Sequence, residues 1–232
     1  MIELPQIYND WLQKKNIEES DKHGKSGMFY ASSTGSCIKK TLYTQLATKG
    51  SEFDSKTLRV FRLGELVHED IQKAVAEMIP ETEKFHVWIE KEFVNKKHNV
   101  KCRIDVGFYD ENTKIVDIYD IKTVHSYKWS KMFGRKKDTN PSVNYELQLG
   151  SYGLAIRDEL GDVDQNFYLA WYKKDDSSMK QIEISPEWEE MAAEYWDDIN
   201  SSPPVTEIPR DSYGSPIQKW ECRYCQFESI CK

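Results

Sequence analysis

The sequence predicts one domain of mixed α/β class, and three features of its hydrophobic pattern carry this prediction. Apolar residues recur at four-residue steps over residues 58–79, the spacing of one face of a helix. From residue 86 to residue 122 apolar and polar residues alternate, as in half-buried strands. A second long helical pattern, over residues 143–160, is followed by two more alternating segments.

The N-terminal part is predicted to be helical. A short helix is expected over residues 4–16, followed by a polar loop over residues 18–27. The serine-rich residues 32–36 could cap a second helix over about residues 37–48. The long helix over residues 58–79 has an apolar face at Leu63, Val67, Ile71, Val75 and Ile79.

Three strands are expected next, over residues 86–94, 99–109 and 114–122. A basic loop or short helix follows the third strand. Glycine at position 161 closes the predicted helix over residues 143–160.

Two more strands, over residues 167–174 and 179–184, complete the predicted sheet. Ser185, Pro186 and Glu187 form a favourable start for a last helix that reaches about residue 200.

Composition limits the class of protein. The chain has 232 residues with 32 basic and 39 acidic side chains, a net charge of -7, which argues against coating of nucleic acid through bulk positive charge. A local basic groove is compatible with this balance. No segment approaches the roughly 18 uninterrupted apolar residues of a membrane helix, and the N-terminus has no signal-peptide pattern. We expect a cytoplasmic protein without a membrane partner.

Acidic residues on two neighbouring strands suggest a site. Asp105 lies opposite the apolar face of its strand, while Asp120 and Lys122 share a face of the next strand. If these strands form a hairpin, two carboxylates and an ammonium converge. Charges on an amphipathic sheet most simply face water. Val116 and Ile118 precede Asp120 on its face, however, so this acid ends an apolar row and needs a partner or a metal.

Two pairs of residues lie one helical turn apart on predicted helices. Gly64 and His68 form the first pair, and the absent glycine side chain leaves space beside the imidazole. Gln148 and Tyr152 form the second pair and could bridge an active site and a phosphate. Each pair alone is more simply explained as a structural feature.

The order of these features is more specific than any one of them. GxxxH on a helix, an aspartate on a strand, Asp-Ile-Lys on the next strand and QxxxY on a helix follow one another. This set resembles the RecB-like branch of the PD-(D/E)xK nuclease superfamily over roughly residues 58–155. The resemblance implies a restriction-endonuclease-like α/β core, with a mixed central sheet flanked by helices. Two positions depart from the family pattern, since Cys102 replaces a frequent glycine and Asp120 replaces a frequent glutamate.

The cysteines point to a ligand set, because five are too few for a disulfide scaffold. Cys222, Cys225 and Cys231 form a C-x2-C-x5-C pattern after a proline-rich strap over residues 201–216, while Cys37 lies near the N-terminus. Four thiolates suit zinc or an iron–sulphur cluster. The arrangement resembles the iron–sulphur subgroup of the superfamily, which includes CRISPR-associated small exonucleases and AddB-type repair nucleases. A zinc site and unconnected cysteines are the alternatives.

This resemblance implies how one nuclease domain of residues 1–232 is organised. A 4Fe-4S cluster would join residues 1–57 and 201–232 into a cluster-binding region beside a core of about residues 58–200. Cys102 alternates with apolar residues and is expected to be a small buried hydrophobe.

The same resemblance implies a metal site. Asp105 and Asp120 are hard oxygen ligands that suit Mg2+ or Mn2+, and His68 adds a nitrogen that favours Mn2+. The backbone carbonyl of Ile121 would complete the protein ligands.

Further catalytic roles follow from the resemblance. Lys122 would orient the attacking water and stabilise charge on the phosphate. Gln148 and Tyr152 would position the lysine or the DNA backbone. Glu92, on the preceding strand, is a candidate acid outside the metal ligands.

The segment after the expected catalytic lysine suits single-stranded DNA, because cations follow phosphates and aromatic rings stack on unpaired bases. It contains no acid over residues 128–137, and its candidate DNA-binding residues are Lys128, Trp129, Lys131, Arg135, Lys136 and Lys137. A solvated basic helix or loop is the alternative. No ATP binding is expected, because Glu19 occupies the position of the first glycine that a phosphate loop ending in Gly24, Lys25 and Ser26 would need.

Together these features predict a metal-dependent DNA nuclease, an exonuclease that hydrolyses phosphodiester bonds at single-stranded ends in recombination, repair or phage DNA metabolism. A second hypothesis is an accessory nuclease of CRISPR adaptation that processes spacer precursors with an integrase or recombinase as partner. A third is a non-catalytic, zinc-containing DNA-binding module. The complete set of Asp105, Asp120 and Lys122 argues against the third.

Overall fold

The computed structural model describes residues 3–23, 27–135, 142–210 and 221–231. The chain forms two compact units. The first, here called the sheet unit, contains Tyr30–Gly35 and Val67–Ser201, and the second, the terminal unit, contains Met1–Phe29, Ser36–Leu66 and Ser202–Lys232. Gly24, Lys25 and Ser26 of the phosphate-loop comparison, the predicted DNA-binding residues Lys136 and Lys137, and part of the proline-rich strap lie outside the described residues.

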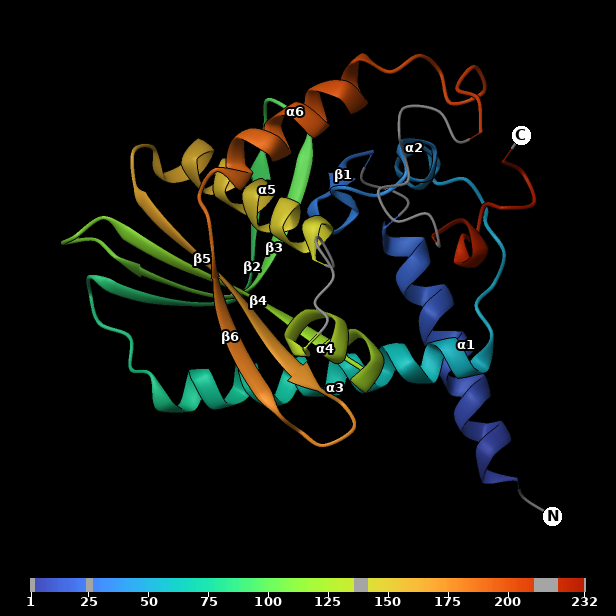
Figure 1. The fold of residues 1–232 in the computed structure, drawn as a ribbon, viewed down its shortest axis with the longest axis horizontal. Helices are drawn as coiled ribbons and strands as arrows, with labels where there is room; N and C mark the ends of the chain where they lie inside the picture. Colours follow the sequence, from blue (N-terminus) through green and yellow to red (C-terminus); the bar gives the residue numbers. More distant parts are fainter. Residues whose placement is uncertain (1–2, 24–26, 136–141, 211–220, 232) are drawn as a thin grey trace. The chain divides into compact units, whose positions relative to one another are not determined.

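A six-stranded mixed sheet forms the centre of the sheet unit, in the order β1-β3-β4-β5-β6, with β2 also paired to β3 (Figure 1). Neighbouring strands are antiparallel in the pairs β2–β3, β3–β4 and β5–β6, whereas β4 and β5 are parallel. The strand bounds are β1 Phe29–Tyr30, β2 Phe85–Asn95, β3 Val100–Asp110, β4 Ile115–Val124, β5 Asp164–Lys173 and β6 Met179–Ile184. The expected mixed sheet is therefore confirmed.

The β3–β4 hairpin opens at the two predicted site aspartates. Its antiparallel ladder ends at the pair Val106 and Tyr119. One step further along this register, Asp105 lies opposite Asp120. There the backbone N–H of Ile121 donates to Asp105 Oδ2 at 2.7 Å. A side chain thus takes the place of the strand ladder, and both carboxylates lie where the strands separate.

Two helices form the layer on the sheet. Helix α5 (Val143–Leu160) connects the parallel strands β4 and β5 and packs against β2, β3 and β5, while α6 (Trp188–Ser201) packs on α5 (Figure 1). Small residues allow this close approach, since a Cβ at Gly150 would lie 2.1 Å from the Trp188 carbonyl oxygen. Ser151 adds a polar link, because its hydroxyl accepts from Trp196 Nε1 at 2.8 Å.

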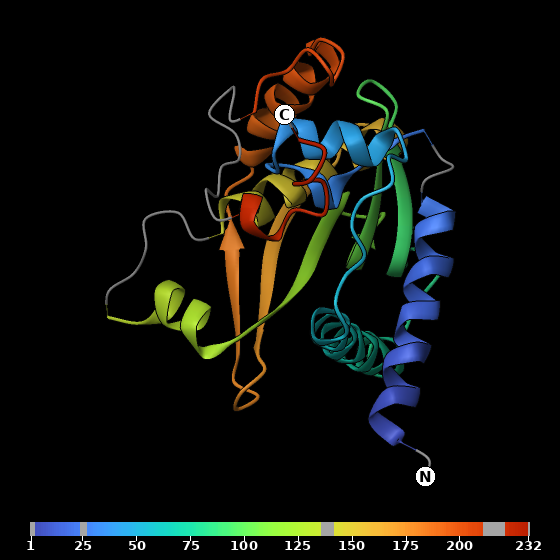
Figure 2. The same cartoon turned by 90° about the vertical axis from the view of Figure 1, so that its right-hand side faces the viewer.

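Two further helices flank the site. Helix α3 (Ser55–Met78) contributes its part from Val67 onward to the sheet unit. Helix α4 (Ser126–Phe133) follows β4 directly, so the segment expected as a basic loop or short helix is a helix. Its first N–H, that of Ser126, donates to Asp175 Oδ2 at 2.7 Å in the turn after β5. Figure 2 shows α4 beyond the end of β4 and the β5–β6 hairpin with its tight turn.

The terminal unit brings together segments from both ends of the sequence. It contains α1 (Leu4–His23), α2 (Ile38–Gln45) and the short helix η2 (Glu221–Tyr224). Lys40 on α2 pairs with Glu221 at 2.7 Å, and the Tyr43 ring packs on Phe227 with 5.2 Å between centroids. Phe227 is 1% exposed, so the C-terminal segment has a small core of its own with α2.

Several expected element bounds differ from the structure by up to a few residues, and two of the differences have a local cause. Residues 18–23 belong to α1 rather than to a loop, because this polar segment contains good helix formers and no glycine before Gly24. Helix α6 begins at Trp188 rather than at Ser185, since Ser185 and Pro186 first form a turn whose carbonyls accept from Trp188 and Glu189. Among the helices of the described residues, none combines the length and the apolar character needed to cross a bilayer.

Candidate active site

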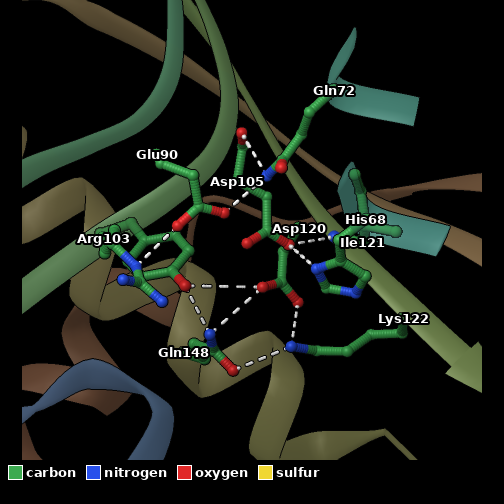
Figure 3. A network of polar contacts seen from close by, with 10 residues as sticks. His68, Gln72, Glu90, Arg103, Asp105, Asp120, Ile121, Lys122 and Gln148 are labelled. Atoms are coloured by element: carbon green, nitrogen blue, oxygen red, sulfur yellow. Dashed lines mark hydrogen bonds and ion pairs between the residues drawn. The ribbon is translucent and has the colours of Figure 1, made fainter. Parts of the chain in front are cut away.

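The Asp120 carboxylate and the Lys122 ammonium form the centre of a buried polar network (Figure 3). Lys122 Nζ lies 2.6 Å from Asp120 Oδ2 and donates to Gln148 Oε1 at 3.1 Å. Gln148 Nε2 donates to Asp120 Oδ1 at 3.1 Å and to the Tyr152 hydroxyl. The Tyr152 hydroxyl lies 3.5 Å from Asp120 Oδ1. The one-turn spacing on α5 thus directs both polar side chains toward one carboxylate of β4.

Asp105 and His68 complete the predicted set from two other elements. Asp105 on β3 accepts from the Ile121 N–H, and His68 Nδ1 on α3 lies 3.6 Å from Asp105 Oδ2. That separation is too long for a good hydrogen bond. The structure therefore brings together all six predicted catalytic residues and the Ile121 backbone.

Glu90 on β2 is a neighbour that the sequence did not single out. Its Oε1 accepts from Gln72 Nε2 at 2.6 Å, and its Oε2 lies 2.6 Å from Arg103 Nε (Figure 3). Gln72 also donates to the Asp105 carbonyl at 3.1 Å. The expected role of Glu92 as an acid near the metal ligands was wrong, because its carboxylate pairs with Lys101 at 2.7 Å on the exposed side of the hairpin.

The register of β2 against β3 separates Glu90 from Glu92, because it sets Glu92 opposite Arg103 and Glu90 opposite Asp105. Both acids share a face of the strand, so alternation alone does not distinguish them; Glu90 has a φ of +52° where the ladder is interrupted between Ile89 and Lys91. This left-handed conformation costs a residue with a side chain roughly 1–2 kcal/mol. A signal did exist for Gln72, which lies one helical turn after His68.

Burial perturbs the titration of the two aspartates. It raises the pKa of Asp105 to about 6, opposed by the Lys122 ammonium and by the Ile121 N–H. It also raises the pKa of Asp120 to about 6, again opposed by Lys122 and reinforced by Asp105. Both acids thus hold protons more strongly than exposed carboxyls.

The pKa values of the two basic groups of the site, Lys122 and His68, shift in opposite directions. Burial lowers the pKa of Lys122, but Asp120 and Asp105 outweigh it, so the net pKa is raised and the ammonium stays charged. The pKa of His68 is lowered, first by burial and then by Lys122. A neutral imidazole leaves a nitrogen lone pair available to a metal.

The donor set fits a divalent cation. Asp120 Oδ2 is buried, and its contact in the described part of the chain is the ion pair with the Lys122 ammonium at 2.6 Å rather than a hydrogen bond of good geometry. One ammonium thus faces the two carboxylates of Asp120 and Asp105, which leaves a negative charge that a cation can neutralise, and carboxylates are preferred ligands of Mg2+. As the side chains lie, no three His, Cys, Asp or Glu residues among those described are arranged as a finished metal site. Metal binding therefore requires side-chain adjustment.

The family profile of the PD-(D/E)XK nuclease superfamily matches residues 52–232. The chain belongs to this superfamily. Membership supports a nuclease function, with DNA as the substrate and divalent metals such as Mg2+ or Mn2+ as cofactors.

The solved structure of SSO0001 has the fold of this PD-(D/E)XK protein. SSO0001 is similar with a TM-score of 0.60 at 19% identity, over 96% of this chain and 94% of SSO0001. An alkaline exonuclease (LHK-Exo) from Laribacter hongkongensis gives a TM-score of 0.46 at 14% identity, over 79% of this chain and 93% of that protein. No curated protein sequence matches the chain.

The four predicted cluster cysteines of this PD-(D/E)XK protein line one pocket of the terminal unit. Cys37 directly precedes α2, while Cys222, Cys225 and Cys231 come from the C-terminal segment. The pKa of Cys225 is raised, first by burial, and Cys37 contributes to the same shift. Two chain ends therefore present thiols to one cavity. As these side chains lie, the described thiols are likewise not arranged as a finished metal site.

The fifth cysteine lies in the core of the sheet unit. Cys102 is 0% exposed, its thiol donates to the Ser151 carbonyl at 3.4 Å, and burial raises its pKa. These contacts confirm it as a small buried residue.

Four of the six predicted DNA-binding residues are described, and they lie on or directly after α4. Lys128 and Trp129 are half-buried, whereas Lys131 and Arg135 are exposed. The Trp129 ring packs edge-on against Phe133 with centroids 4.7 Å apart. Cations and aromatic rings thus occur together on the helix that follows the Lys122 strand.

Proposed function

We propose that this PD-(D/E)XK protein is a metal-dependent deoxyribonuclease, an exonuclease that hydrolyses phosphodiester bonds at single-stranded DNA ends. The observation that carries the proposal is the pair of buried aspartates, Asp105 and Asp120, beside a charged Lys122. Two carboxylates whose pKa values are raised by burial, beside a single ammonium, are unfavourable for stability alone and are typical of functional sites.

Four groups of the site are suited to bind the metal. His68, Asp105, Asp120 and the Ile121 carbonyl would hold Mg2+ or Mn2+. When bound, the metal supplies positive charge beside the phosphate and makes water a better nucleophile.

Lys122 stays protonated and donates to the phosphate oxygens on which charge develops. Gln148 orients this ammonium through its Oε1 and orients Asp120 through its Nε2. Tyr152 holds the same amide, and burial keeps its hydroxyl protonated by raising the pKa. Lys128, Trp129, Lys131 and Arg135 on and after α4 would bind the single strand that leaves the site.

The terminal unit would hold a structural 4Fe-4S cluster on Cys37, Cys222, Cys225 and Cys231. Support comes from the common pocket that these thiols line and from the chemistry of thiolates, which are the usual ligands of such clusters. Because the ligands come from both chain ends, the cluster would act as a clamp of this unit. Residues 1–232 would then form a single nuclease domain that acts in recombination, repair or phage DNA metabolism.

The first experiment is cleavage of end-labelled single-stranded DNA by anaerobically purified protein with Mg2+, Mn2+ or EDTA. We expect metal-dependent release of labelled fragments, abolished by Asp120→Asn. Asp117→Asn is the matched control, because Asp117 lies on the same strand and bonds Asn166 rather than the site. Equal cleavage by both variants would refute the assignment of the site.

Iron and sulphide analysis with a visible spectrum tests the cluster separately. We expect a brown protein with four iron atoms per cluster, which Cys225→Ser makes colourless and poorly soluble. Cys102→Ala should keep the colour, since Cys102 does not line the pocket. A colourless protein with bound zinc would refute the cluster. A brown protein that cuts no DNA alone would favour the hypothesis that an integrase partner is required.

A further inference from the structure

Tyr145 lies between two lysines at the edge of the candidate active site. It belongs to the first turn of α5, three residues before Gln148. Lys122 Nζ lies 4.8 Å and Lys128 Nζ 4.2 Å from the centroid of its ring. Lys128 Nζ also donates to the Tyr145 hydroxyl at 3.0 Å. One aromatic ring thus contacts the ammonium of the site and an ammonium of α4.

The ring itself is held in place by the core. It packs edge-on against Trp171 of β5, with centroids 5.6 Å apart and an interplanar angle of 70°. Trp171 is 0% exposed and lies beside Lys122 in the parallel β4–β5 register. The position of Tyr145 is therefore fixed by the strand that neighbours Lys122.

The two lysines differ in their counter-charges. Lys122 has the Asp120 carboxylate at 2.6 Å. No carboxylate forms an ion pair with Lys128 among the described residues, where its partners are the Tyr145 hydroxyl and ring and the more distant Trp171 ring at 6.0 Å. The Lys128 ammonium is held in place beside the candidate active site and has no ion pair with a described carboxylate. Such an ammonium is suited to bind a phosphate group.

We propose that Tyr145 is a positioning residue that couples Lys122 to substrate binding by Lys128. In this arrangement Lys128 binds the phosphate next to the one being cleaved, and the Tyr145 hydroxyl holds Lys128 for that contact. The face of the ring restrains the Lys122 ammonium, in addition to the contacts that Asp120 and Gln148 make with it. The proposal rests on the nuclease function proposed above.

The hydroxyl and the ring of Tyr145 can be separated by substitution. Tyr145→Phe keeps the ring and loses the bond to Lys128, so we expect KM to rise about three- to ten-fold with kcat unchanged. Tyr145→Leu also removes the cation–π contact with Lys122, so kcat should fall by about three- to thirty-fold. If the ring were merely structural, the two substitutions would not separate KM from kcat in this way. Under the proposal, phenylalanine keeps the kcat that leucine loses.

Binding without cleavage supplies an independent measurement. The probe is a fluorescent single-stranded oligonucleotide in EDTA, with anisotropy recorded over a series of salt concentrations. Lys128→Gln should reduce the slope of log Kd against log salt by about 0.7, the value for one phosphate contact on a single strand. Tyr145→Phe should weaken binding with an unchanged slope. Lys73→Gln is the control, because this exposed lysine of α3 pairs with Glu77 away from the site.

The outcomes distinguish the two proposals. If the wild-type protein and Lys73→Gln cleave no DNA, the nuclease proposal fails, while the salt slope still tests the role of Lys128. If they cleave but Lys128→Gln keeps the wild-type slope, or Tyr145→Leu keeps the wild-type kcat, the coupling through Tyr145 is refuted. Circular dichroism of Tyr145→Leu identifies a folding defect, and Tyr145→Phe then decides the matter alone.

Discussion

Substitution of Asp105 by asparagine should stabilise the metal-free protein while it abolishes cleavage. Burial raises the pKa of Asp105 from 3.8 to about 6. Since one pKa unit corresponds to 1.36 kcal/mol, the folded state disfavours the ionised carboxylate by roughly 3 kcal/mol at neutral pH. Asparagine removes this charge and keeps an oxygen for the Ile121 N–H, but its new amide donor needs an acceptor. We therefore expect a gain of about 1–3 kcal/mol in the free energy of unfolding.

The pH dependence gives the sign of this effect. Below about pH 3 Asp105 is protonated in both the folded and the unfolded chain, so wild-type protein and variant should be equally stable. As the pH rises to about 6 the unfolded chain ionises first, and the wild-type protein loses stability relative to the variant. Above that pH the full difference is present.

Urea denaturation in EDTA, near pH 7.5 and at about pH 3, measures this difference. Mn2+ should stabilise the wild-type protein and not the variant, because the metal binds only the folded carboxylate. Asp110→Asn is the matched control on the same strand. The turn at Asn112 lowers the pKa of Asp110, so that variant should gain no stability. An Asp105→Asn protein that is less stable than the wild type near pH 7.5 without metal would refute the reasoning.

Three further substitutions test the site and the packing around it. Lys122→Met should lower the cleavage rate by about 10²–10³ with an unchanged circular dichroism spectrum; unchanged cleavage would move the reacting centre elsewhere. Gly150→Ala should lower the free energy of unfolding by about 1–3 kcal/mol, because its Cβ would lie 2.1 Å from the Trp188 carbonyl oxygen; a variant as stable as the parent in urea would contradict the close approach of α5 and α6. Ser151→Ala should cost about 1–3 kcal/mol in the same assay, because it leaves the buried Trp196 N–H without its acceptor; full stability would mean that this bond contributes nothing.

Part of the candidate site was predictable because its signals are local. The apolar row of Val116 and Ile118 placed Asp120 on a buried face, and Asp120 is 0% exposed. The one-turn spacing of Gln148 and Tyr152 placed both side chains on one face of a helix, and both contact Asp120. Periodicity determines such relations because it acts within one element.

The sequence by itself determined the order of the longer helices and strands, the buried row that ends in Asp120, and the grouping of thiols at the two chain ends, but not the short strand β1. Only the tertiary structure decided that Glu90 rather than Glu92 lies beside Asp105, and that Tyr145 lies between Lys122 and Lys128. The first choice depends on the register of β2 against β3, which sets Glu92 opposite Arg103 and Glu90 opposite Asp105, and alternation along one strand does not encode that register. The second depends on contacts among α4, α5 and the parallel strands β4 and β5. Such contacts arise from packing between distant segments, and no spacing along the chain specifies them.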